Sequence, residues 1–115
     1  MKKKAPITYP DFEKVDLKIG TIIKVDDFPE ARNPAYQLHI DFGTEIGILK
    51  SSAQITKRYT KENLLNRQIV AIVNFPKKQI GKFMSECLVL GAVEKEGDVV
   101  LLNPGFKVAN GTSIS

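Results

Sequence analysis

The stretch LKIGTIIKVD, residues 17–26, is the clearest strand in the sequence and decides the fold. Its odd-numbered positions, 17 to 25, hold Leu, Ile, Thr, Ile and Val. They alternate with residues that include Lys18, Lys24 and Asp26. This period of two predicts a strand whose odd positions face the core. The next stretch, FPEARNP at residues 28–34, ends the strand, because its two prolines cannot donate ladder hydrogen bonds.

Further elements are expected on both sides of this strand. Residues 35–41 alternate again and place Tyr36, Leu38 and Ile40 on one face. The other predicted elements are a helical turn over 10–14, a returning strand over 45–50, a helix over 53–59 capped by Ser51 or Ser52, a short turn opened by Thr60 with Asn63, strands over 68–75 and 85–93 around a basic loop at 76–83, and a terminal arm over 98–103.

Along the chain, the predicted elements come in the order of three strands, a helix and two more strands. This is the order found in a five-stranded Greek-key barrel of the OB type. An SH3-like barrel or a small sandwich would lack the helix in the middle of the chain. We therefore expect an all-β fold with a short helix and with N- and C-terminal extensions. A single domain over 12–115 follows a basic tail and lead-in segment over 1–11, and no repeat or linker divides it.

Two predicted strands are apolar on both faces, which an exposed barrel strand is not. They lie at 69–73 and 99–102. Either the terminal extension or a second copy of the chain must cover them, and the short chain favours a homodimer. The residues expected at the dimer interface are Phe12, Val99, Val100, Leu101, Leu102 and Phe106.

The composition is that of a globular domain and excludes several classes of protein. The 115 residues are 43% hydrophobic and 26% charged, with a net charge of +4. Apolar stretches fall far short of the roughly 20 residues of a membrane helix, so no membrane insertion is expected. The opening MKKK is followed by two prolines and an acid rather than by an apolar segment, which favours a cytoplasmic location.

The residues that carry enzyme chemistry are sparse, so we expect no enzyme, no catalytic residues and no cofactor. One cysteine, Cys87, and one histidine, His39, exclude an internal disulfide and a Cys/His zinc site, and no metal is expected. A nucleophilic pair of these two residues lacks any surrounding signature. The glycines do not have the spacing of a phosphate-binding loop.

Four blocks of sequence, in order, resemble the tRNA-binding domain family, an OB-fold module that also occurs at the C-terminus of methionyl-tRNA synthetases. They are residues 12–22, then 28–32 with 34–36, then 51–56, and last 73–76 followed by 79–81 and 83–86. Within that family the chain is most similar to the export-related chaperones. This resemblance implies a cytoplasmic homodimer that binds unfolded or precursor polypeptides and delivers them to the ATPase of the export translocase, without a cofactor.

Two departures from the tRNA-binding members favour the chaperone branch. Those relatives carry glycine after their first serine at the end of the third strand, where this chain has Ser51-Ser52-Ala53. The order Met84-Ser85 also differs from their usual Ser, Gly and Met. The alternative function is that of a tRNA-binding accessory protein that uses the basic surface of the OB fold.

A chaperone needs exposed apolar surface with a polar rim, because it must hold many sequences. The residues expected to bind polypeptides are Phe28, Pro29, Tyr36, Phe75, Ile80, Phe83 and Met84. The alternative is that most of them fill the mouth of the barrel or a dimer interface.

An OB fold binds nucleic acid through a basic groove with stacking aromatic residues. The residues expected to contact tRNA are Arg32, Asn74, Lys77, Lys78, Lys82 and Ser85. Here the alternative is a solvated basic loop, and the nearby acids Asp26, Asp27 and Glu30 would weaken the attraction for phosphate.

Overall fold

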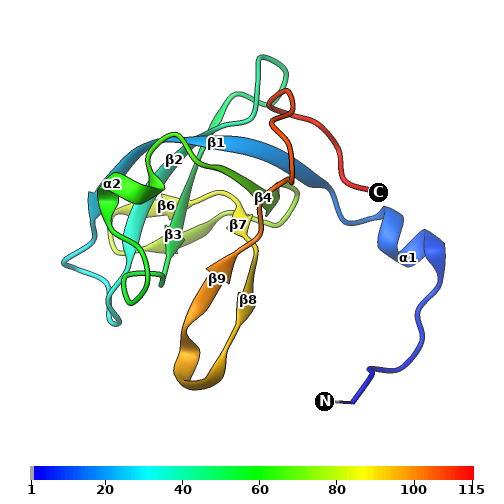
Figure 1. Ribbon diagram of the computed structural model, residues 1–115, viewed down its shortest axis with the longest axis horizontal. Coiled ribbons are helices and arrows are strands. Elements are labelled where there is room, and N and C mark those ends of the chain that lie inside the picture. The colour runs from blue at the N-terminus through cyan, green and yellow to red at the C-terminus, as the bar shows by residue number, and fades with distance from the viewer. Residues whose placement is uncertain (1) are drawn as a thin grey trace.

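An antiparallel sheet of five strands curls until its two edge strands meet, which forms a nearly closed barrel (Figure 1). The computed structural model describes residues 2–115. The strand order is β3-β2-β1-β4-β7. This confirms the predicted all-β, five-stranded, OB-like barrel with a short helix. The elements are α1 (Tyr9–Glu13), β1 (Leu17–Asp27), β2 (Tyr36–Asp41), β3 (Ile48–Ala53), α2 (Lys61–Leu64), β4 (Gln68–Ile72), β5 (Lys78–Ile80), β6 (Phe83–Ser85), β7 (Leu88–Val89), β8 (Gly91–Val93), η1 (Lys95–Gly97) and β9 (Val99–Leu101).

A β-bulge divides β1 and reverses the predicted orientation of its first half. The register with β2 pairs Ile22 with Ile40 and then Lys24 with His39, so Ile23 is the extra residue. Ile22 lies in the core, whereas Ile23 is 41% exposed. The prediction that the odd positions face the core is therefore wrong before the bulge, where the even positions point inward, and holds for Val25 beyond it.

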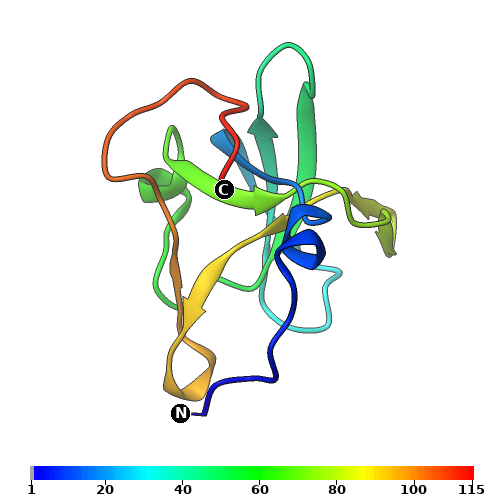
Figure 2. The ribbon, with the colours of Figure 1, turned by 90° about the vertical axis from the view of Figure 1, so that its right-hand side faces the viewer.

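The C-terminal extension pairs with the free edge at the start of β1 and passes over its outer face, where Asn110 accepts the hydroxyl of Thr21. The N–H of Ile19 donates to the carbonyl of Thr112 at 2.9 Å, and the N–H of Gly111 donates to the carbonyl of Ile19 at 2.7 Å. Ile19 is buried as a result, although it points away from the core cluster. Figure 2 shows this last segment turning back over β4 toward β1. On this face, the terminal extension is the cover.

Local capping places the helices, and one predicted helix is wrong. The side chain of Thr60 accepts the N–H of Asn63, and the Asn63 side chain accepts the N–H of Thr60, so this pair begins α2. The helix expected over 53–59 does not form, because Ser51 and Ser52 belong to β3. The predicted turn over 10–14 is α1, which Thr8 caps. The basic loop at 76–83 contains part of a second hairpin, β5–β6.

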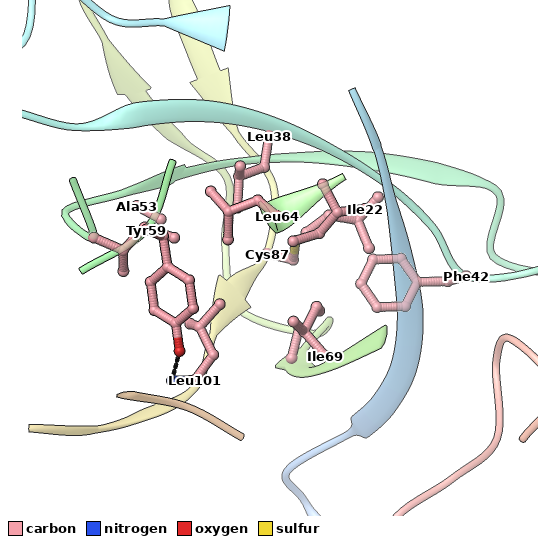
Figure 3. Close-up of a cluster of buried hydrophobic side chains, with 12 residues drawn as sticks. Ile22, Leu38, Phe42, Ala53, Tyr59, Leu64, Ile69, Cys87 and Leu101 are labelled. Carbon is pink, nitrogen blue, oxygen red and sulfur yellow. Dashed lines mark hydrogen bonds between the residues drawn. The ribbon is translucent and has the colours of Figure 1, made fainter. Parts of the chain in front are cut away.

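The core fills the barrel with side chains from most of its strands (Figure 3). Leu38 and Ile40 are fully buried, as the alternation of β2 predicts. Tyr59 lies at the edge of this core, where its hydroxyl accepts the N–H of Leu101 at 2.9 Å. The carbonyl of Tyr59 accepts the hydroxyl of Tyr36 at 2.8 Å. These two hydrogen bonds connect β9 and β2 to the segment that precedes α2.

The barrel closes between β3 and residues 85–87 through side chains as well as backbone. The N–H of Glu86 donates to the carbonyl of Lys50 at 2.7 Å, and the Glu86 carboxylate accepts the N–H of Lys50 at 3.0 Å. Nearby, the hydroxyl of Ser85 accepts the N–H of Ser52 at 3.3 Å. Side-chain oxygens therefore satisfy edge donors of β3 that would otherwise lack partners.

We expect Gly20→Ala to destabilise the barrel, because a Cβ at this position would lie 2.7 Å from side-chain atoms of Ile40 and Phe42. Overpacking of this kind costs about 1–3 kcal/mol of unfolding free energy, measurable by urea denaturation. Gly105→Ala is the matched control, since a Cβ there has no neighbour within 4 Å. Equal unfolding midpoints for the two variants would contradict the packing of Gly20.

Candidate ligand-binding loops

Two loops meet at one end of the barrel and share a small core of their own. The loop between β1 and β2 contributes Phe28 and Ala35, and the β5–β6 hairpin contributes Phe83. The rings of Phe28 and Phe83 lie 5.3 Å apart between centroids and are tilted by 57°. Ala31 and Ile80 pack against them. We call these five residues the mouth cluster. It packs the two loops against each other outside the main core.

A hollow of about 430 Å³, the mouth groove, opens beside the mouth cluster. Phe28 and Phe83 provide its apolar floor. Its other lining residues are Glu30, Gln37, Gly81 and Lys82. Glu30, Gln37 and Gly81 also line the groove, although no sequence pattern predicted them as binding residues. The signal for Gln37 is its place on the polar face of β2, two residues from the loop that carries Phe28.

The residues expected to bind polypeptides separate into three groups. Phe28 and Phe83 are only 5% and 7% exposed and fill the mouth, as the alternative interpretation proposed, although they also line the groove. Pro29 and Phe75 are exposed, and Phe75 retains 49% of its accessible surface. The half-buried residues are Tyr36, Ile80 and Met84.

The residues expected to contact tRNA also differ in what their side chains do. Arg32, Lys77, Lys78 and Lys82 are exposed on the two loops. Lys77 forms an ion pair with Glu86 at 3.4 Å.

Asn74 and Ser85 already have backbone partners. The amide of Asn74 accepts the N–H of Asp16 at 2.9 Å and donates to the carbonyl of Lys14 at 2.7 Å, which attaches the stretch between α1 and β1 to the end of β4. Ser85 lies in the seam with β3. Both side chains hold the barrel together rather than extending freely toward solvent.

The residues expected at a dimer interface lie on the β8–β9 hairpin, in the segment after it and on α1. The hairpin projects from the barrel (Figure 1). Its Asp98 carboxylate lies 2.6 Å from Arg58 Nη2. Phe106 is 88% exposed, and Val93, which is not among the residues predicted for the interface, is 73% exposed. Leu101 is buried in the core of its own chain. The half-buried residues are Phe12, Val99 and Val100, and Leu102 is exposed.

The groups that could perform chemistry lie apart from the mouth groove. Burial raises the pKa of the Cys87 thiol to about 12, so this thiol stays protonated at neutral pH. Within residues 2–115, no group of three or more His, Cys, Asp and Glu side chains could hold a metal ion. None of the helices described for these residues is long and apolar enough to cross a bilayer.

Comparison with known proteins identifies related sequences over almost the whole chain. The family described as "Putative tRNA binding domain" matches residues 17–113. The methionine–tRNA ligase of Thermococcus onnurineus is 36% identical over 108 residues, which are 94% of this chain. The chain spans only 14% of the length of that ligase.

Two solved structures have the same fold over their entire length. The chaperone CsaA of Bacillus anthracis has a TM-score of 0.91 and 55% sequence identity, with 96% of this chain and 100% of that chain covered. The CsaA chaperone protein of Picrophilus torridus has a TM-score of 0.89 and 52% identity, with the same coverage. The predicted resemblance to the chaperone branch is therefore confirmed.

Proposed function

The chain belongs to the tRNA-binding domain family, and on that premise we propose that it is a non-catalytic chaperone that binds unfolded or precursor polypeptides. One observation carries this proposal. The chain matches two CsaA chaperones over their full length at more than half identity, whereas it corresponds to a small part of the ligases. Delivery to the ATPase of the export translocase is part of the proposal and follows from the export-related branch that the sequence resembles.

The mouth groove is the proposed binding surface for polypeptides. Its floor of two aromatic side chains offers apolar contact, while Glu30 and Lys82 supply charges of both signs at the rim. A shallow surface of this kind suits extended segments of differing sequence better than one fitted ligand. Phe75 is a separate exposed apolar side chain outside the lining of the mouth groove, on the segment that leads into the β5–β6 hairpin. Met84 adds an unbranched side chain that adapts to different partners.

We propose that two chains associate through the exposed apolar side chains of the β8–β9 hairpin and of the segment that follows it. Val93 and Phe106 are the most exposed of these side chains. The hairpin also borders a hollow of about 700 Å³ that is lined by Ala92, Val93 and Val100 among others. Two mouth grooves on one dimer would raise the avidity for a long unfolded chain without strong binding at each groove.

We expect Phe75→Ser to weaken the suppression of client aggregation severalfold, because it removes exposed apolar surface while leaving the mouth cluster intact. The measurement is light scattering from heat-denatured citrate synthase with stoichiometric dimer. Ile48→Ser is the matched control, since Ile48 is also exposed but begins β3 at the end opposite the mouth. Failure of the unaltered protein to suppress aggregation would contradict the chaperone function.

Sedimentation equilibrium tests the association of two chains. We expect the unaltered chain to sediment as a dimer and the double variant Val93→Ser, Phe106→Ser to shift toward monomer, because apolar burial drives such interfaces. Ile48→Ser serves again as a surface control. A monomer at micromolar concentration for the unaltered chain would contradict the dimer.

A specific observation supports tRNA binding as the alternative function. Cationic side chains crowd the two mouth loops, and within residues 2–115 neither Arg32 nor Lys78 has a carboxylate within 4.0 Å. The ligase relative is itself named for tRNA. Phosphate contacts through these two side chains would add to binding in a manner that depends on salt.

We expect the double variant Arg32→Glu, Lys78→Glu to weaken retention of tRNA at least tenfold and to reduce the salt dependence by about two phosphate contacts. Filter binding over a salt series provides the measurement. The double variant Lys3→Glu, Lys95→Glu changes the net charge equally at exposed positions outside the loops and serves as control. If both double variants behave alike, the loop surface is not a tRNA site. The double variant Arg32→Glu, Lys78→Glu should still suppress the aggregation of an unfolded client.

A further inference from the structure

A second hollow, of about 480 Å³, lies on the wall of the barrel and shares no residue with the mouth groove. One side consists of Thr21 from β1 and of the chain that enters β4. The other side is the segment after β9, which Figure 2 shows rising past α2 and arching over β4. The lining side chains that matter here are Asn66 and Arg67 on the first side and Asn103 and Lys107 on the second. We call it the wall hollow.

The bulge in β1 holds the first side in place. The N–H of Asn66 donates to the carbonyl of Ile22 at 2.8 Å, and the N–H of Ile22 donates to the carbonyl of Arg67 at 3.0 Å. Asn66 adopts a left-handed backbone conformation with φ of 68°, which asparagine tolerates better than most residues. The backbone that carries these two side chains is therefore hydrogen-bonded to β1 directly beside its bulge.

The guanidinium of Arg67 is oriented before any ligand binds. Its Nε donates to the carbonyl of Asn63 at 3.2 Å, and its Cζ lies 5.2 Å from the centroid of the buried Tyr59 ring. Within residues 2–115, its terminal amino groups have no hydrogen-bond partner and no carboxylate lies within 4.0 Å. Because the side chain is already ordered, binding an anion there costs less conformational entropy than at a free arginine.

The opposite side is also fixed. The amide of Gln68 donates to the carbonyl of Val108 at 2.7 Å and accepts the N–H of Val108 at 3.2 Å. Asn110 accepts hydrogen bonds from Thr21 and Gln68. These contacts hold the segment that presents Lys107 against the barrel.

The charge of the wall hollow is not neutralised by the protein. Six lysines and Arg58 elsewhere in residues 2–115 form ion pairs with carboxylates, but Lys107 and Arg67 do not. The lining of the hollow includes no Asp or Glu. Two cations thus face one polar space without a counter-charge, an arrangement that attracts an anion.

We propose that the wall hollow binds the phosphate group of a nucleotide, with Arg67 and Lys107 as its two cationic contacts. A guanidinium matches the geometry of phosphate oxygens, and an ammonium adds a second charge. The volume is within the roughly 300–1,000 Å³ of small-molecule sites and leaves room for more than a bare phosphate. The side-chain amides of Asn66 and Asn103 offer donors and acceptors for a sugar or base.

The test is a titration of the full chain with AMP, followed through its backbone amides by NMR. We expect saturable shifts at Asn66, Arg67 and Lys107, and roughly tenfold weaker binding in Lys107→Ala, because a charge-assisted contact is lost. Lys95→Ala, an exposed lysine on the β8–β9 turn, should bind like the unaltered chain. Arg67→Gln should weaken binding similarly. Arg67 packs on the Tyr59 ring, so Arg67→Gln could lose stability as well as the phosphate contact. Lys107→Ala then remains the decisive variant.

Two further titrations, with inorganic phosphate and with a short RNA, identify the source of the phosphate. Inorganic phosphate that binds as well as AMP would restrict the site to an adventitious anion and overturn the nucleotide proposal. A single-stranded RNA hexamer that shifts the same amides more tightly than AMP would support the proposal with the RNA backbone as the source. Shifts that do not saturate, or that persist in Lys107→Ala, would overturn it. The result is independent of the mouth groove, which these substitutions do not touch.

Discussion

Strand β1 is the one element on which the rest of the structure depends, because it has three different backbone partners along its length. Its later part pairs with β2, its earlier part pairs with β4, and the free edge at its start is completed by residues 111–114. The bulge at Ile23 lets one strand serve these partners by changing which residues point inward. Ile19 is covered by the C-terminal extension, while Ile22 enters the core.

Closure of the barrel relies on a different kind of contact. The seam between β3 and residues 85–87 uses the carboxylate of Glu86 and the hydroxyl of Ser85 to satisfy backbone donors. The β5–β6 hairpin forms its own two-stranded sheet, adjoins β3 through Ser85, and packs on the other loop through Phe83 against Phe28. The mouth groove therefore results from a seam that side chains complete, together with a small separate core that holds its two loops.

The two functions under consideration would use neighbouring parts of one surface. Apolar side chains at the mouth suit extended polypeptides, and the lysines and arginine of the same loops suit phosphate. Lys82 belongs to both, since it lines the groove beside Phe83. An OB-like barrel supports either role because its loops can change while the strands keep their pairing. The full-length similarity to CsaA chaperones favours polypeptide binding. The match to methionine–tRNA ligases supports tRNA binding as the alternative.

The amino-acid sequence by itself determined the succession of strands and helix along the chain, the barrel class, the alternation of β2 and the Thr60 and Asn63 cap of α2, because these depend on local periodicity and short-range hydrogen bonds. It also indicated which two loops carry the apolar and basic residues at the mouth. Only the tertiary structure decided the bulge at Ile23, the burial of Phe28 and Phe83 against each other, and the meeting of Arg67 with Lys107 across the wall hollow. Those features join residues distant in the chain, and their energies come from packing and from backbone partners that no local pattern specifies.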